Sequence, residues 1–93
     1  MTITLAIVVK IPTDGIASFD EYENRVLPLL KNHGGTLQRR LRAQNHMTEF
    51  HILSFESQSS FNGFLADPER EKHRNLLIKS NAIIELFNVE DLI

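Results

Sequence analysis

Runs of β-branched and apolar residues mark the strands expected in this chain. Residues 2–10, TITLAIVVK, are rich in β-branched side chains and are followed by Pro12 and Gly15, which predicts a strand. Because apolar residues occupy both alternating sets of positions, we expect this strand to lie in the middle of a sheet. Three further strands are predicted at about 36–43, 48–56 and 82–89, with a hairpin at QNHM.

Apolar residues spaced three and four positions apart predict a first helix. Its start is expected at Ser18, because SFDE can form a capping box, and its end at the Gly34-Gly35 pair. Pro28 lies inside this pattern and removes one backbone hydrogen bond. We therefore expect Pro28 to kink the helix or to split off its last turn.

A second helical region is expected after the third strand, with Ser57 or Ser59 as its cap and a restart at ADPE, where Asp67 precedes Pro68. The resulting order, βαββαβ, is that of the ferredoxin-like α+β sandwich. We expect residues 1–93 to form one such domain, a four-stranded antiparallel sheet with two helices on one face. The other face would then expose Val8, Phe50 and Ile52, so a second copy of the chain is the simplest cover and a homodimer is predicted.

Composition excludes several classes of partner. A net charge of −2 and the scarcity of aromatic residues on the central strands argue against nucleic acid, and no apolar run is long enough for a membrane span or a signal peptide. The chain has no cysteine, and its four histidines are not spaced as metal ligands, so we expect no metal and no cofactor. We expect a cytoplasmic protein.

Three longer stretches resemble an uncharacterised bacterial family of the dimeric α/β-barrel superfamily, related to the antibiotic-biosynthesis monooxygenase group. They are IPTDGIASFDEYENRVLPLLKNHGG, HILSFESQSSFNGFLADPEREKHRNLL and ELFNV, and the HGG and DPER segments are their most specific parts. The resemblance implies a homodimer whose sheets face each other and enclose a space for a small organic molecule. It also implies that Arg40 matches a family arginine, and that Ser54 stands where the family tends to carry a glutamate.

The arginines of the second strand raise the question of which face they occupy. With a three-residue hairpin loop, Arg40 would lie opposite Phe50, and Arg42 and Ser54 would share the enclosed face with them. A two-residue loop would instead pair Arg40 with His51. We prefer the first register, which also places Leu53, Phe55, Leu37 and Leu41 against the helices.

A guanidinium on the enclosed face could hold a carboxylate or an enolate oxygen of a ligand. The alternative is an ion pair between Arg40 and a carboxylate such as Glu49, Glu85 or Glu90. His73 and Arg74, on the second helix, are expected at the mouth of the pocket, whereas the mixed charges around Arg70 and Lys72 are typical of a solvated helix face. The candidate ligand-binding residues are therefore Arg40, Arg42, Phe50, Ser54, His73 and Arg74.

The preferred functional hypothesis is a homodimeric protein that binds a small organic molecule, neutral or anionic, between the sheet and the partner chain. One alternative is a cofactor-independent enzyme, monooxygenase-like or isomerase-like, that acts on a small organic acid or ketone with His51 or His73 as proton carrier. Another is a structural or regulatory dimerisation module without a ligand. No catalytic residue can be assigned from the sequence.

Overall fold

The computed structural model describes all residues, 1–93. Four strands and several short helices follow one another in the order expected. They are β1 (Ile3–Lys10), η1 (Thr13–Gly15), α1 (Ile16–Val26), η2 (Leu27–His33), β2 (Gly35–Arg42), β3 (Thr48–Phe55), α2 (Gln58–Leu65), α3 (Pro68–Glu71), α4 (Arg74–Ser80) and β4 (Ile83–Val89).

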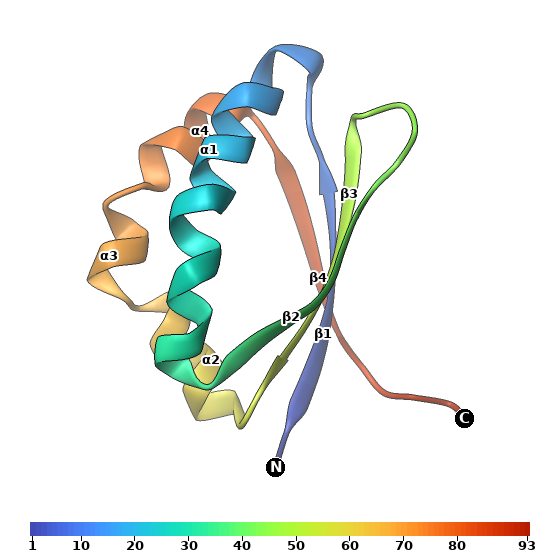
Figure 1. Ribbon diagram of the computed structural model, residues 1–93, viewed down its shortest axis with the longest axis vertical. Coiled ribbons are helices and arrows are strands. Elements are labelled where there is room, and N and C mark those ends of the chain that lie inside the picture. Colours follow the sequence, from blue (N-terminus) through green and yellow to red (C-terminus); the bar gives the residue numbers. More distant parts are fainter.

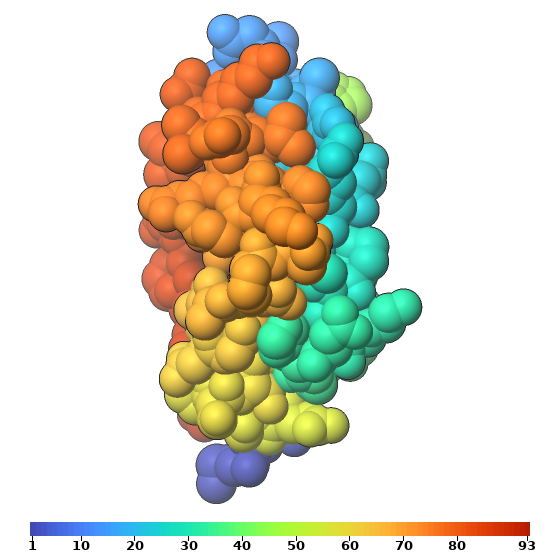
Figure 2. Space-filling model, turned by 90° about the vertical axis from the view of Figure 1, so that its left-hand side faces the viewer, coloured from blue at the N-terminus to red at the C-terminus, as the bar shows by residue number.

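The strands form one antiparallel sheet in the order β2-β3-β1-β4, with β1 in the interior as predicted. All helices lie on one face of this sheet, and nothing covers the other face (Figure 1). Seen from the helical side, α1 and η2 run beside α2, α3 and α4 and together hide most of the sheet, while β4 is visible along one edge (Figure 2). The predicted ferredoxin-like α+β sandwich is confirmed.

The first helix begins earlier than the sequence pattern indicates. A 3-10 turn ending at Gly15 leads directly into α1, so Ser18 lies inside the helix, and the predicted capping box is wrong. Pro28 does split off the end of the helix, because residues 27–33 form the 3-10 helix η2. Gly34 then adopts a left-handed conformation, with φ of 66°, and ends the helical region.

The second helical region starts and restarts at the expected caps. The Ser57 side chain accepts a hydrogen bond from the amide of Ser60 at 3.1 Å, and Asp67 accepts one from the amide of Glu69 at 2.8 Å. Pro68 occupies the first turn of α3. The restart is divided once more, because α3 ends after Glu71 and α4 follows as a separate helix.

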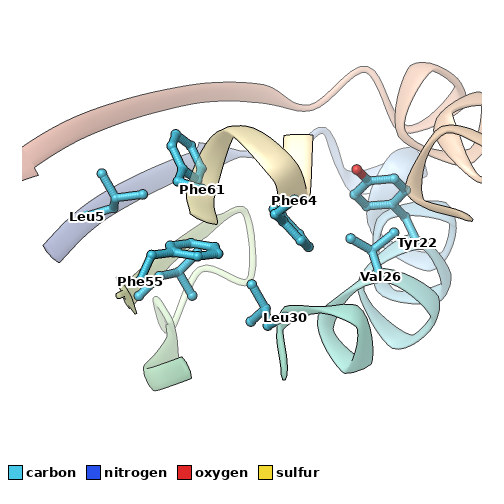
Figure 3. Close-up of a cluster of buried hydrophobic side chains, with 8 residues drawn as sticks. Leu5, Tyr22, Val26, Leu30, Phe55, Phe61 and Phe64 are labelled. Carbon is cyan, nitrogen blue, oxygen red and sulfur yellow. The ribbon is translucent and has the colours of Figure 1, made fainter. Parts of the chain in front are cut away.

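The core lies between the sheet and the helices. Its larger cluster contains Leu5, Tyr22, Val26, Leu30, Leu53, Phe55, Phe61 and Phe64. Figure 3 shows that these side chains come from both layers and meet between them. The rings of Phe61 and Phe64 lie 5.1 and 5.7 Å from that of Phe55. The predicted burial of Leu53 and Phe55 against the helices is confirmed.

A β-bulge in β2 reverses the predicted faces of its second half. Leu37 pairs with Leu53, but Arg39 pairs with Ile52, so Gln38 is an extra residue in the ladder. From there on, Arg40 lies opposite His51, as in the alternative register, and the preferred pairing with Phe50 is wrong. A shift of one residue moves every following side chain to the other face of the sheet. Arg40 and Arg42 therefore face the helices, and Leu41 faces away from them.

The uncovered face of the sheet is apolar. Val8 lies between Phe50 on β3 and Glu85 on β4, and Ala6 lies between Ile52 and Phe87. Phe50 and Phe87 retain 40% and 49% of their accessible surface. We call this surface the open face; its apolar residues are Ala6, Val8, Leu41, Phe50, Ile52, Ile83, Phe87 and Val89.

Candidate functional site

Arg40 and Arg42 point toward the helical side of the sheet and bind one buried carboxylate. Arg40 Nε donates to Glu49 Oε1 at 2.9 Å, and Arg42 Nε donates to Glu49 Oε2 at 2.8 Å. Asp20 on α1 pairs with the outer side of both guanidinium groups. The two arginines therefore have carboxylate partners within their own chain, which is the ion-pair alternative and not the predicted position on the enclosed face.

Glu49 is fully buried and is held as an anion by its partners. Burial opposes its ionisation, but hydrogen bonds from Arg40, His51 and Arg42 outweigh that effect and lower its pKa to about 2. The same network raises the pKa of Arg42, chiefly through hydrogen bonds with Asp20 and Glu49. The buried charge is thus compensated, as a carboxylate removed from water requires.

His51 is the next side chain along this face of β3 and is also buried. Burial lowers its pKa, although the hydrogen bond with Glu49 opposes that shift, so the imidazole is neutral near pH 7. Since ionised Glu49 can only accept, His51 Nε2 carries the hydrogen and donates it to Glu49 Oε1 at 2.9 Å. The lone pair of the neutral ring is therefore on Nδ1, which makes no hydrogen bond within the protein.

An apolar cavity of about 100 Å³ lies beside His51, between the sheet and the helices. Only three of its lining residues are charged or basic: His51 from the sheet, Glu23 from α1 and Arg70 from α3. The other lining residues are Ile7, Val9, Tyr22, Val26, Leu27, Leu30, Leu53, Phe61, Phe64, Leu65, Ile84 and Leu86. Leu65, Ile84 and Leu86 are each more than 40% exposed, so the cavity opens toward edge strand β4.

Glu23 adds a second ionisable group to the cavity wall. Its side chain is buried and makes no hydrogen bond or ion pair, and burial raises its pKa to about 7, against the opposing charge of Arg40. Burial also raises the pKa of the neighbouring Tyr22. The cavity thus joins a neutral imidazole and a carboxyl group that titrates near neutral pH, a combination that is concentrated at functional sites.

The predicted ligand-binding residues lie in three separate places. Phe50 and Ser54 are on the open face, whereas Arg40 and Arg42 are on the helical side of the sheet. His73 precedes α4, and Arg74 lies in its first turn, pairs with Glu71 at 3.3 Å and lines only an outer hollow beside α3. The single chain therefore does not bring these six residues together, and a shared site for them stays a prediction.

The burial of Glu49 and His51 was not predicted from the sequence. Glu49, His51, Leu53 and Phe55 alternate along β3, so the same pattern that buries Leu53 and Phe55 also buries the glutamate and the histidine. The sequence pattern contains this signal, but Glu49 is expected above only as an ion-pair partner of Arg40, and His51 only as an alternative proton carrier. Arg70 gave no such signal, because it lies among alternating charges on a short helix.

Two further findings concern metal and membrane. No group of three or more histidine and acidic side chains lies close enough to hold a metal ion. No helix has the length and apolar character needed to cross a bilayer.

Solved structures with a similar fold include proteins of the antibiotic-biosynthesis monooxygenase type. SnoaB, a cofactor-independent oxygenase from Streptomyces nogalater, is 18% identical with a TM-score of 0.76, over 97% of this chain and 94% of that protein. A candidate antibiotic biosynthesis monooxygenase from Bacteroides thetaiotaomicron is 11% identical, with a TM-score of 0.81, over 99% and 90% of the two chains. A dimeric ferredoxin-like protein of unknown function from Jannaschia is 14% identical, with a TM-score of 0.69, over 95% and 99%.

The sequence matches no protein-family model, and it has no significant match among curated proteins. At these identities the likeness establishes the fold and not the activity. The resemblance stated from the sequence is confirmed at that level: the structural neighbours are ferredoxin-fold proteins like the antibiotic-biosynthesis monooxygenases.

Proposed function

We propose that this protein binds a compact, largely apolar organic molecule between its sheet and its helices, and that His51 Nδ1 takes a proton from the bound molecule. The observation that carries this proposal is a neutral imidazole, oriented by Glu49, on the wall of an apolar cavity. A concave apolar site with a few convergent polar groups is the usual form of a small-molecule site. The acid-base chemistry needs no metal or cofactor.

The Glu49–His51 pair has the parts that a general base requires. Glu49 fixes the ring by accepting from Nε2, which leaves Nδ1 as the basic atom. When Nδ1 takes a proton, the ring becomes a cation, and the anionic carboxylate at 2.9 Å stabilises it. A carbon acid such as a ketone, which loses a proton beside its carbonyl group, is a suitable substrate class.

The binding step is tested by NMR titration with 1-butanol and benzyl alcohol, followed on the methyl groups that line the cavity. Val26→Phe should fill the cavity and abolish the shifts, because Val26 is a lining residue. Val8→Phe makes the same change on the open face and should leave binding intact. The proposal is wrong if neither alcohol shifts the lining methyl groups of the natural protein.

The proton-transfer step is tested by deuterium exchange of butanone in D₂O. We expect the protein to accelerate exchange at the carbon beside the carbonyl group. His51→Gln should remove the acceleration, because its amide can still donate to Glu49 but cannot take a proton. Exchange that is as fast with the variant would show that His51 is not the base.

A cofactor-independent oxygenation is a second candidate, favoured by the structural likeness to SnoaB, which is a cofactor-independent oxygenase. In that reaction a substrate CH₂ group would lose a proton to His51 and an electron to O₂, and the two radicals would combine to a peroxide. Loss of water would leave a carbonyl group, with one oxygen atom on carbon and the other in the water. Oxygen consumption with a readily ionised CH₂ compound tests it, and consumption that His51→Gln does not reduce would contradict it.

We also propose that a second copy of the chain covers the open face. Apolar side chains continue across all four strands of that face, a larger patch than a soluble monomer normally exposes. A two-fold axis parallel to the strands would set the β2 edge, which carries Arg39, against the β4 edge of the other copy, which carries Glu85. The neighbour from Jannaschia is described as dimeric.

Light scattering over a dilution series tests the dimer. Phe87→Lys, on the open face, should give a monomer, because it would bury an unpaired charge in the interface. Ile78→Lys, exposed on α4 outside that face, should leave the dimer intact. A natural protein that stays monomeric at micromolar concentration would contradict both this proposal and the predicted pocket between sheet and partner.

A further inference from the structure

Arg70 does not behave as part of a solvated helix face. Its neighbours Lys72 and Arg74 do, since each forms an exposed ion pair, with Glu69 at 2.6 Å and with Glu71 at 3.3 Å. Arg70 instead turns inward from α3, is not exposed, and lines the cavity. Its guanidinium carbon lies 5.4 Å from the centre of the Phe64 ring, a cation–π contact that holds the group at the cavity wall. The sequence-based expectation is therefore wrong for this one residue.

The guanidinium of Arg70 lacks the acceptors that it needs. It forms no salt bridge, and its single hydrogen bond runs from Nη1 to the carbonyl of Leu65 at a long 3.4 Å. Its Nε is buried without any partner. Every N–H of an arginine is a donor, and a charged donor withdrawn from water without an acceptor costs free energy. A ligand oxygen in the cavity would remove that cost.

The groups that face Arg70 across the cavity do not neutralise it. Glu23 and Tyr22 come from α1 and line the same space, and His51 faces them from β3. The pKa of Glu23 is raised to about 7, so its carboxyl is mainly protonated at pH 6. Burial raises the pKa of the Tyr22 phenol and lowers the pKa of the His51 imidazole, so neither group supplies a negative charge there. Glu49 is ionised, but Arg40, Arg42 and His51 occupy its oxygens. The cavity therefore holds one cation without a counter-ion.

We propose that Arg70 is the anion anchor of this cavity and that the natural ligand is a small monocarboxylate. Its carboxylate would take the donors of Arg70, and its apolar part would lie among the leucine and phenylalanine side chains. This proposal rests on the proposed binding function and adds to it the charge of the ligand. It also assigns ligand specificity to Arg70, a residue that the proposed proton transfer to His51 does not use.

Pairs of probes with the same apolar body separate charge from shape. We choose butyrate with 1-butanol and benzoate with benzyl alcohol, titrated at pH 6 and followed on the cavity methyl groups by NMR. In the natural protein each carboxylate should bind at least about 10-fold more tightly than its alcohol. Arg70→Met should weaken the carboxylates roughly 10- to 100-fold and leave the alcohols nearly unchanged.

Lys72→Met is the matched control, because it removes a positive charge two residues away that does not reach the cavity. It should leave all four affinities unchanged. Arg70→Gln provides a second variant of different shape and should also remove the preference for carboxylates. If the alcohols bind and the preference is absent, or survives both Arg70 variants, the anchor is wrong while the binding function stands. If none of the four probes enters the cavity, both proposals fail.

Discussion

The two faces of the sheet show an unusual contrast: polar residues are buried on one face, and aromatic residues are exposed on the other. The face against the helices contains Glu49 and His51, both buried, whereas the face toward solvent contains Phe50 and Phe87, both about half exposed. Removing a carboxylate from water is costly, and Glu49 is tolerated only because two arginines and a histidine bind it. Leaving phenylalanines in water is also unfavourable. The first cost is met within the chain, and the second would be met by the second copy proposed above.

The contrast between the faces is tested most strongly by truncating one phenylalanine on each. Phe55 is 1% exposed in the core, and Phe50 is 40% exposed on the open face. Phe55→Ala should lower the free energy of unfolding by about 3 to 5 kcal/mol, the usual range for a large core truncation. Urea unfolding measures the effect.

Phe50→Ala is the control for that experiment. At protein concentrations too low for association it should change the free energy of unfolding much less than Phe55→Ala does. At higher concentrations it should weaken the proposed dimer. Equal destabilisation by the two substitutions under monomeric conditions would contradict the assignment of faces.

Removing the buried charge should have the next largest effect. The pKa of Glu49 is lowered from 4.5 to about 2, so ionised Glu49 stabilises the fold above pH 4.5, and this contribution disappears as the pH falls toward 2. At roughly 1.4 kcal/mol per unit, the contribution at pH 7 is about 3 kcal/mol. Glu49→Gln should therefore be destabilising by about that amount at pH 7. The deficit should shrink toward pH 2, and a deficit that does not depend on pH would indicate a loss of packing instead.

Glu23, on the helical wall of the apolar cavity beside His51, should show a pH dependence of the opposite sign. Its folded pKa of about 7 lies above the ordinary 4.5, so the fold retains a proton that the unfolded chain releases, and stability falls between pH 4.5 and 7. Glu23→Gln should raise the free energy of unfolding by about 2 to 3 kcal/mol at pH 8 and change it little at pH 4. Thermal unfolding at the two pH values checks this. A stability gain that is the same at both would show that Glu23 is not the titrating group.

The fold could be predicted from the sequence because its signals are local and repeated. β-branched runs mark β1 and β3, Gly34 ends the first helical region, and Ser57 and Asp67 cap the second. The start of α1 could not be placed in the same way. Its first residue follows a 3-10 turn without any side-chain cap, so the capping box at Ser18, although plausible, has no role there.

The site was harder to predict because it depends on a bulge. One extra residue at Gln38 turns Arg40 and Arg42 toward Glu49 and turns Leu41 toward the open face. No glycine, proline or cap residue in the strand indicates a bulge at that position. The regular alternation of the strand therefore predicts the wrong face for each of these three residues. The inward turn of Arg70 depends in the same way on tertiary contact with Phe64, which the alternating charges of its helix do not indicate.

The smallest expected effect on the free energy of unfolding comes from the adjacent residues Arg39 and Arg40, which face opposite sides of the sheet. Arg40→Met removes two hydrogen bonds to Glu49, of 2.9 and 3.4 Å, and should lower the free energy of unfolding by about 1.5 to 3 kcal/mol, the range for hydrogen bonds to charged groups. Arg39→Met, on the open face, loses no ion pair within the chain and should change it by less than about 0.5 kcal/mol. Both substitutions remove one positive charge and replace it with the same side chain, so a general electrostatic effect would be equal in the two variants.

Urea unfolding of both variants, under monomeric conditions, measures the difference in the free energy of unfolding. If Arg39→Met were the more destabilising of the two, the bulge at Gln38 would be misplaced and the arginines would face the sides that regular alternation assigns to them.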